Sequence, residues 1–245
     1  MNAVVMPIYC CRTLATKAIP TIMEQDVPIT LLVINNGSQD GSLQAVEALR
    51  SKYRNIFIKT FVSPVPLSRT WNCGIDWAFE NGAREVLVLN DDVELRADFY
   101  RVLRSDPHGL VTGVGVDSRS WQTARTAPLN LTFNTHPTFS AYMLKKWAWE
   151  KVGRFDENYL MGYCEDGDWH LRAHRAGVKC ICLNIPFLHH GSASGNSMSE
   201  DERKVLMEQA DRNRDYFEQK WGFRMASKDY YDAFSHGPPP DKGYE

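Results

Sequence analysis

Several common sequence features are missing from this chain of 245 residues. No apolar run approaches the roughly 20 residues that a membrane-spanning helix needs, and the first residues lack the charged and then apolar layout of a secretory signal. The formal net charge of -2 provides no overall basic field that would attract nucleic acid. We therefore expect a cytoplasmic protein without a membrane span.

Two types of nucleotide-binding loop are also missing. The chain contains neither Gly-x-Gly-x-x-Gly nor a loop that ends in Gly-Lys-Ser/Thr, which disfavours dinucleotide dehydrogenases and P-loop enzymes. Its six cysteines include no Cys-x-x-Cys motif. We interpret them as reduced thiols of the core or of a site wall, rather than as a zinc or redox centre.

Apolar strand patterns and helical periodicities alternate through the first hundred residues. Strands are expected at Ala3–Tyr9, Ile29–Ile34, Ile56–Val62 and Glu85–Leu89, with helices at Leu43–Tyr53 and Thr70–Glu80. Repeated units of this kind predict an α/β fold with a mostly parallel, Rossmann-like sheet flanked by helices.

The second half of the chain is less regular. A short helix is expected at Ala97–Arg104, and strands at Leu110–Val116, Thr138–Leu144 and Cys180–Leu188. The polar stretch Ser118–Pro137 is expected to be a long loop, either a flap that faces a substrate or plain surface.

A capping box at Ser199–Glu202 predicts a helix that runs to about Trp221. Val205, Leu206, Tyr216 and Phe217 are available for an apolar face that packs on the core. Its basic residues are expected to form either a solvated face or a local basic stripe; they are Arg203, Lys204, Arg212, Arg214, Lys220 and Arg224.

A first acidic cluster, Asn90-Asp91-Asp92, ends the apolar strand at Glu85–Leu89. Ligands of open α/β sheets bind at the carboxyl ends of the strands, so these side chains are well placed for a site. Carboxylates there can hold a hard divalent ion that neutralises a diphosphate, with Asp92 as the preferred ligand. The alternative is a turn whose amides are satisfied by Asn and Asp side chains.

A second acidic cluster, Glu165-Asp166-Gly167-Asp168, opens a helix that continues to about Ala176. One acid at this place would be explained by helix capping and the helix dipole. Three acids in four positions exceed that need, and burial beside other carboxylates raises a pKa toward the range of a general base. We assign that role to Asp166.

A pair of histidines, His189 and His190, follows the strand at Cys180–Leu188. One imidazole can serve as a further metal ligand beside a carboxylate. The alternative is a loop histidine that bonds to backbone.

In this order, the motifs resemble those of family 2 glycosyltransferases with the GT-A fold, from Ala3 to about Trp221. The matching segments are Val5–Tyr9, Val33–Ser42, Trp71–Gly74, Leu89–Val93, Gly153–Glu157, Glu165–Trp169 and the late histidine motif at His189. The pair Gly153–Glu157 and Glu165–Trp169 is the most specific, because it is similar to the family's Gly-x-Phe-Asp-Glu followed by Glu-Asp-x-Asp.

The resemblance implies an inverting transfer of a sugar from a nucleoside-diphosphate sugar to an acceptor hydroxyl. It implies that Asp166 is the general base, with Glu165 and Asp168 in the same catalytic cluster, and that Asp92 and His189 hold Mn²⁺ or Mg²⁺. The donor is expected to contact Pro7, Tyr9, Asn35, Asn36, Gly37, Ser38, Asp40, Asn72, Asn90 and Asp91.

The resemblance also implies a single domain over residues 1–225. Residues 1–95 would bind the nucleotide sugar and residues 96–225 would form a smaller acceptor-side half. Residues 226–245, rich in proline and glycine from Ser235 onward, are expected to be a mobile tail.

Two residues depart from the family pattern. Asn35 stands where the family commonly has an acid that accepts a hydrogen bond from uracil. The resemblance therefore favours a uridine donor, but the amide of Asn35 can donate as well as accept, which weakens the preference for uridine. Asn90 leaves fewer charges around the metal.

Other functions stay open on the sequence alone. The first is a catalytically inactive protein that binds nucleotide or carbohydrate on the same scaffold. The second is a nucleotidyltransferase, which is disfavoured because this chain lacks a Gly-rich basic loop near the first strand. A surface glycan is the favoured acceptor, and a modified DNA base, a protein side chain or another hydroxyl compound is the alternative.

Overall fold

A computed structural model describes residues 1–134, 137–191 and 199–235. The strands are β1 (Ala3–Ile8), β2 (Thr30–Asn36), β3 (Ile56–Phe61), β4 (Glu85–Leu89), β5 (Val93–Leu95), β6 (Leu110–Val116), β7 (Phe133–Asn134), β8 (Ala141–Lys145) and β9 (Cys180–His189). The helices are α1 (Arg12–Met23), α2 (Ser42–Leu49), α3 (Leu67–Glu80), α4 (Phe99–Ser105), α5 (Ser118–Ala124), α6 (Lys146–Val152), α7 (Glu165–Arg175), α9 (Glu200–Trp221) and α10 (Lys228–Asp232).

The strands form one sheet in the order β3-β2-β1-β4-β8-β6-β9-β5, with β7 paired to β9. Parallel pairing joins β3, β2, β1 and β4. Since β8 is antiparallel to both β4 and β6, β6 points the same way as β4, and β9 is parallel to β6. The predicted α/β class with a mostly parallel sheet is confirmed, and the carboxyl ends of β1, β2, β4 and β9 share one edge.

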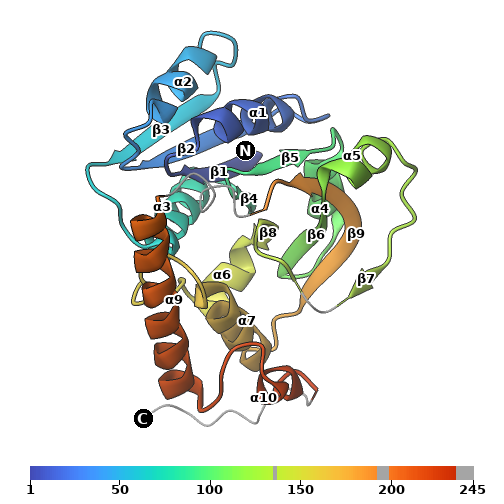
Figure 1. The fold of residues 1–245 in the computed structure, drawn as a ribbon. Helices are drawn as coiled ribbons and strands as arrows, with labels where there is room; N and C mark the ends of the chain where they lie inside the picture. The colour runs from blue at the N-terminus through green and yellow to red at the C-terminus, as the bar shows by residue number, and fades with distance from the viewer. Residues whose placement is uncertain (135–136, 192–198, 236–245) are drawn as a thin grey trace.

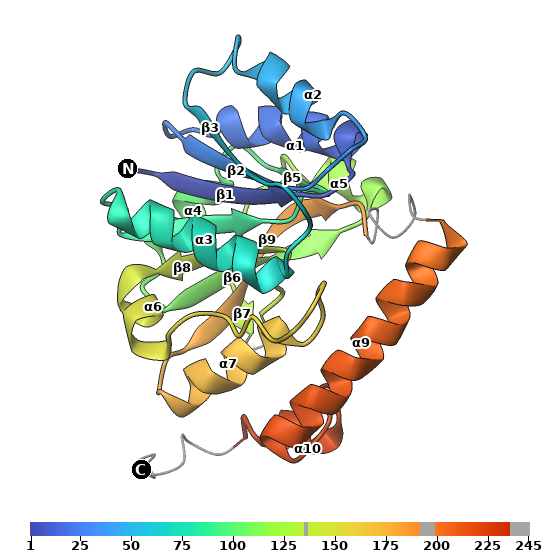
Figure 2. The ribbon, with the colours of Figure 1, turned by 90° about the vertical axis from the view of Figure 1, so that its left-hand side faces the viewer.

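Helices cover both faces of this sheet (Figures 1 and 2), which is why β1 is buried along its whole length. Side chains alternate along β1, so Val4 packs in the cluster with α1 and α4 while Val5 packs in the cluster with α3 and α7. A Cβ atom at Gly74 of α3 would lie 2.2 Å from Cγ1 of Val5. The missing side chain thus lets α3 lie close against the strands that carry the site.

Two segments differ from the sequence-based expectation. Residues 12–23 form α1 although Pro20 interrupts their apolar pattern. The expected loop at Ser118–Pro137 contains α5 and β7, so that expectation is wrong for those residues. Asp117 caps α5 by accepting the Ser120 N–H bond at 2.8 Å, and β7 is held by pairing with β9, a long-range contact that local composition does not reveal.

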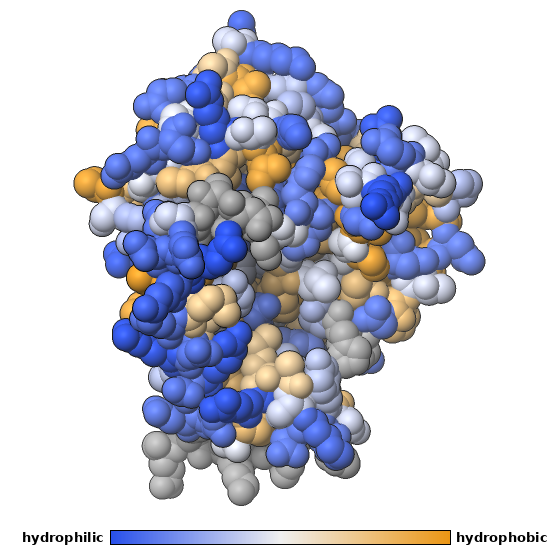
Figure 3. Space-filling model, viewed as in Figure 1, coloured by the Kyte–Doolittle hydropathy of each residue, from blue (hydrophilic) through white to orange (hydrophobic). Residues whose placement is uncertain are grey.

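Helix α9 begins with the predicted capping box, in which the Ser199 and Glu202 side chains each bind the other residue's backbone N–H. Its packing differs from the prediction. Phe217 is fully buried, whereas Val205 is 56 % exposed, because α9 buries residues only from Ala210 onward. The outer side of the helix is hydrophilic (Figure 3).

The expected tail at residues 226–245 begins with ordered structure instead. Helix α10 lies within it, and the Tyr230 ring packs 6.1 Å from the Phe217 ring of α9. The expectation is therefore wrong for this part, and residues 236–245 lie outside the described residues. No helix in the described part of the chain is both long and apolar enough to cross a membrane.

Candidate active site

A cavity of about 740 Å³ lies at the carboxyl edge of the sheet. It is bounded by the ends of β1, β4 and β9, by the segment before α3, and by residues 160–166, which lead into α7. Nine of the predicted site residues line it: Pro7, Tyr9, Asn36, Asn90, Asp91, Asp92, Glu165, Asp166 and His189. The two acidic clusters, 73 residues apart in the chain from Asp92 to Glu165, therefore face one cavity.

The first acidic cluster has one carboxylate bound to backbone and one that faces a histidine. Asp91 Oδ2 accepts the Tyr9 N–H bond at 3.1 Å, and burial raises the pKa of Asp91 to about 6. Asp92 Oδ2 lies 3.3 Å from Nε2 of His189, and this hydrogen bond raises the pKa of His189. His190 points elsewhere and binds Glu94 Oε1 at 2.8 Å. Of the two histidines, His189 is the one beside the acidic cluster.

Asp92 and His189 fit a divalent ion in their donor chemistry. Asp92 Oδ1 is buried and has no hydrogen-bond partner among the described residues, so it offers a free oxygen to a cation. Carboxylate oxygen suits Mg²⁺ and Mn²⁺, and imidazole suits transition ions. Among the residues that the structure describes, no three His, Cys, Asp or Glu side chains are grouped to hold a metal. The remaining ligands would come from substrate and water.

The second acidic cluster places two carboxyl groups at the start of α7. Glu165 is 4 % exposed, and its Oε2 has no partner among the described residues. Burial and the neighbouring Asp166 charge raise the pKa of Glu165 to about 8. Burial also raises the pKa of Asp166, although the Gly167 N–H donates to Asp166 Oδ1 at 2.7 Å. Because that donor stabilises only the Asp166 anion, Asp166 is the member of the pair that ionises more readily.

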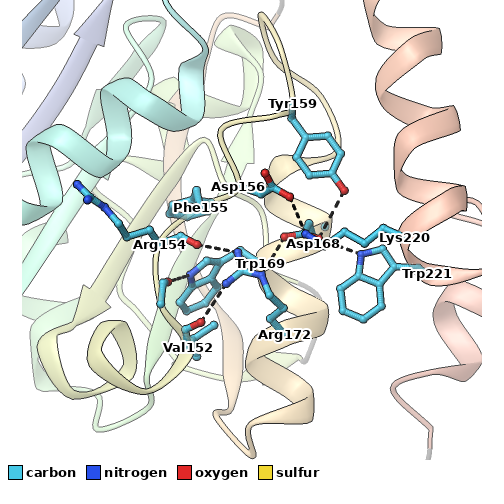
Figure 4. A network of polar contacts seen from close by, with 12 residues as sticks. Val152, Arg154, Phe155, Asp156, Tyr159, Asp168, Trp169, Arg172, Lys220 and Trp221 are labelled. Atoms are coloured by element: carbon cyan, nitrogen blue, oxygen red, sulfur yellow. Dashed lines mark hydrogen bonds and ion pairs between the residues drawn. The ribbon is translucent and has the colours of Figure 1, made fainter. Parts of the chain in front are cut away.

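Asp168, predicted to belong to the catalytic cluster, does not line the cavity. It is fully buried between α7 and α9 (Figure 4), where Arg172 Nε donates to Oδ2 at 2.9 Å. Its Oδ1 contacts Lys220 Nζ at 2.7 Å and the Trp221 indole N–H at 2.9 Å. These contacts satisfy both oxygens, so we expect Asp168 to serve packing rather than catalysis. They also tie Lys220, whose side chain is 29 % exposed, to Asp168, so it is neither a purely solvated residue nor free for a basic stripe.

The loop after β2 uses its polar side chains to fold on itself. Asn35 is 2 % exposed and does not line the cavity. Its Oδ1 accepts a hydrogen bond from the Ser38 N–H at 3.0 Å. The Ser38 hydroxyl in turn accepts the Cys10 N–H bond at 3.1 Å. Asp40 accepts backbone N–H bonds from Arg12 and Ser42. The structure thus brings this loop beside β1 but leaves these side chains outside the cavity.

Three further residues that were predicted to contact the donor have structural roles in the fold. Asn36 lines the cavity while its amide makes two bonds to the backbone of Val65 at 2.9 Å. Gly37 has φ 78°, and a Cβ atom there would lie 2.9 Å from the Pro64 nitrogen, so the turn requires glycine. Asn72 is buried away from the cavity and exchanges two hydrogen bonds with the backbone of Phe155.

Several cavity residues were missed from the sequence. Helix α9 contributes Leu206 and Arg214, and the turn before α7 contributes Leu160–Tyr163. Leu160, Met161 and Tyr163 are 47 %, 43 % and 46 % exposed, so they form an apolar lip at the cavity mouth. An apolar residue of a loop carries no local signal that distinguishes a cavity wall from ordinary surface, and only the tertiary contacts of α9 bring Arg214 here.

Comparison with known proteins agrees with this geometry. A model of glycosyl transferase family 2 matches residues 3–149. No curated protein sequence matches the chain significantly.

Solved structures share the fold at low sequence identity. The mannosyltransferase PcManGT from Pyrobaculum calidifontis, in complex with GDP-Man and Mn²⁺, superposes with a TM-score of 0.59 and 16 % identity over 77 % of this chain and 56 % of its own. S. aureus TarS in complex with UDP-GlcNAc superposes with a TM-score of 0.56 and 15 % identity over 78 % of this chain and 56 % of its own. GalNAc-T7 with UDP, GalNAc and Mn²⁺ superposes with a TM-score of 0.63 and 10 % identity over 77 % of this chain and 43 % of its own. The chain spans about half the length of the structures it matches, and these likenesses concern the fold.

Proposed function

The chain belongs to glycosyl transferase family 2, and from this premise we propose that it transfers a sugar from a nucleoside-diphosphate sugar to an acceptor hydroxyl with inversion. The observation that carries the proposal is the cavity itself. Asp92, with an unpartnered buried oxygen, and Asp166, with a raised pKa, line the same space of about 740 Å³. An inverting displacement needs a stabilised leaving group and a base within one site.

The donor would lie across the carboxyl ends of β1, β2 and β4. Asp92 and His189 would hold Mn²⁺ or Mg²⁺, and the bound ion would supply charge neutralisation for the departing diphosphate. Arg214 is the one lysine or arginine among the described residues that line the cavity, and it adds a cation to the site. We favour a uridine nucleotide as the donor.

The transfer forms one bond and breaks one bond at the anomeric carbon. The acceptor oxygen attacks that carbon while the bond to the diphosphate oxygen breaks, and the hydroxyl proton passes to Asp166. The Gly167 N–H helps to keep Asp166 ionised before the proton arrives. The apolar lip at Leu160–Tyr163 supports a glycan acceptor, since sugar rings pack well against such side chains.

The experiment is incubation of the wild-type chain with UDP-, GDP- and dTDP-sugars in Mn²⁺, in Mg²⁺ and in chelator, with the nucleoside diphosphate released as the readout. Asp92→Ala should lose the metal-stimulated turnover and keep the fold, whereas Asp215→Ala, a control whose carboxylate is 64 % exposed, should behave as wild type. Full wild-type activity in chelator would refute the metal assignment. Nucleotide binding without turnover of any donor would favour the inactive binding protein, and release of pyrophosphate would favour a nucleotidyltransferase.

A further inference from the structure

The turn that leads into the second acidic cluster is strained. Met161, Tyr163 and Cys164 have φ values of 63°, 77° and 76°, a region that residues with a Cβ atom rarely adopt. Three such residues lie within four positions, immediately before Glu165 and Asp166. A conformation of this kind persists only when the surrounding structure holds it.

The side chain that holds this turn comes from α9. Asn213 is 2 % exposed, and its Nδ2 group donates to the carbonyl oxygens of Leu160 at 2.8 Å and Gly162 at 2.7 Å. The same group lies 3.3 Å from the carbonyl oxygen of Tyr163, and Asn213 Oδ1 accepts the Leu160 N–H bond at 3.3 Å. One primary amide has two N–H donors, so two of the three carbonyl groups share a donor. A single side chain thus contacts four backbone polar groups of the turn.

Other contacts orient the amide and attach its helix. Within α9, Gln209 Nε2 donates to Asn213 Oδ1 at 3.0 Å and orients the amide. Toward the end of α9, Lys220 bridges Asp156 and Asp168, at 2.7 Å from each carboxylate (Figure 4). The amide is therefore presented to the turn by a helix with its own fixed attachment to α7.

We propose that Asn213 is a positioning residue that keeps the turn at residues 160–164 in its left-handed conformation and thereby sets Asp166 and the apolar lip at the cavity. Asn213 does not line the cavity and would act only through the turn. The catalytic consequence rests on the proposed glycosyl transfer, while the effect on the turn does not. Without the amide, the carbonyl oxygens of Gly162 and Tyr163 lose this donor, and the strained residues relax toward ordinary backbone conformations.

Two substitutions separate the donor from the acceptor role of the amide. Asn213→Ala removes both, and Asn213→Asp keeps an oxygen for the Leu160 N–H but loses the donors and sets a carboxylate against carbonyl oxygens. Gln219→Ala is the matched control, because it removes an exposed amide from the same helix.

Cysteine labelling in the native protein reports on the turn directly. Cys164 lies in the turn, is 4 % exposed, and has a pKa that burial raises to about 12, so its thiol should react slowly in the wild type. Cys180 on β9 is 5 % exposed and reports on opening of the core. Both Asn213 variants should label Cys164 at least about tenfold faster, the effect of losing roughly one buried hydrogen bond, with labelling of Cys180 unchanged. The value of kcat should fall at least about tenfold while the KM for the donor stays within about twofold.

The outcomes are distinct. Faster labelling of Cys164 alone, with lower kcat and the control at wild-type values, supports the proposal. Wild-type labelling of Cys164 in either Asn213 variant overturns it, as does an equal acceleration at Cys164 and Cys180, which would indicate global destabilisation. If the wild type turns over no nucleotide sugar, the proposed function fails, and the labelling rates still decide whether Asn213 holds the turn.

Discussion

Replacement of Asp168 by asparagine tests whether this acid serves packing or catalysis. Asparagine has nearly the same shape, but it is neutral and carries an N–H₂ group in place of one oxygen. In the wild type Asp168 is fully buried. One of its oxygens accepts a hydrogen bond from Arg172 Nε at 2.9 Å, and the other contacts Lys220 Nζ and the Trp221 indole N–H. The variant would leave two cations facing an amide.

The size of the effect follows from the burial of these charges. The Arg172 side chain is 23 % exposed and that of Lys220 is 29 % exposed, so water cannot fully solvate them once the carboxylate is gone. Lys220 keeps its bridge to Asp156, so the main loss is that of hydrogen bonds from charged groups to a buried carboxylate, which are worth about 1.5 to 3 kcal/mol. Since α9 is attached at this point, we expect Asp168→Asn to lower the free energy of unfolding by about that amount.

Urea unfolding followed by tryptophan fluorescence measures the effect, because Trp169 and Trp221 lie beside Asp168. Asp215→Asn is the control, as this exposed acid pairs with Arg224 at 3.4 Å and should change stability by less than about 0.5 kcal/mol. If Asp168→Asn is too unstable to purify, Lys220→Met keeps the carboxylate and should destabilise less. A variant of Asp168 with wild-type stability and no transferase activity would refute the packing role and restore Asp168 to the catalytic cluster.

Two further predictions concern the carboxyl pair at the start of α7. Asp166→Asn should retain binding of the nucleoside diphosphate in calorimetry and lose roughly a hundredfold or more in kcat, the usual scale for a positioned base; an active Asp166→Asn beside an inactive Glu165→Gln would instead identify Glu165 as the base. The folded-state pKa of Glu165, about 8, lies above its ordinary value of 4.5, so the folded protein holds a proton that the unfolded chain releases and stability falls as pH rises between these values. This group should therefore lower the stability of the wild type steadily between pH 5 and pH 7, by an amount on the order of a few kcal/mol. Urea unfolding of Glu165→Gln should show a flatter pH dependence, and parallel curves for the two proteins would contradict the burial of an unpartnered Glu165.

The sequence by itself determined the main strands of the sheet and the edge of the sheet that carries the site. Periodicity is a local property, so the strands at Ala3–Ile8 and Glu85–Leu89 and the start of α9 at its capping box were predictable from neighbouring residues alone. The position of Asp92 at the end of a buried strand was likewise enough to place it at the carboxyl edge.

Only the tertiary structure decided which acids face the cavity. Glu165, Asp166 and Asp168 lie within one turn of α7, where a step of about 100° per residue sends successive side chains in different directions. The rotation of α7 against the sheet and against α9 selects among them, and it turns Asp168 toward Lys220 while Asp166 lines the cavity. The same long-range packing brings Asn213 to the turn at residues 160–164, some fifty residues earlier in the chain. No local pattern contains that contact, because its strength comes from burying an amide between two segments that meet only in the folded protein.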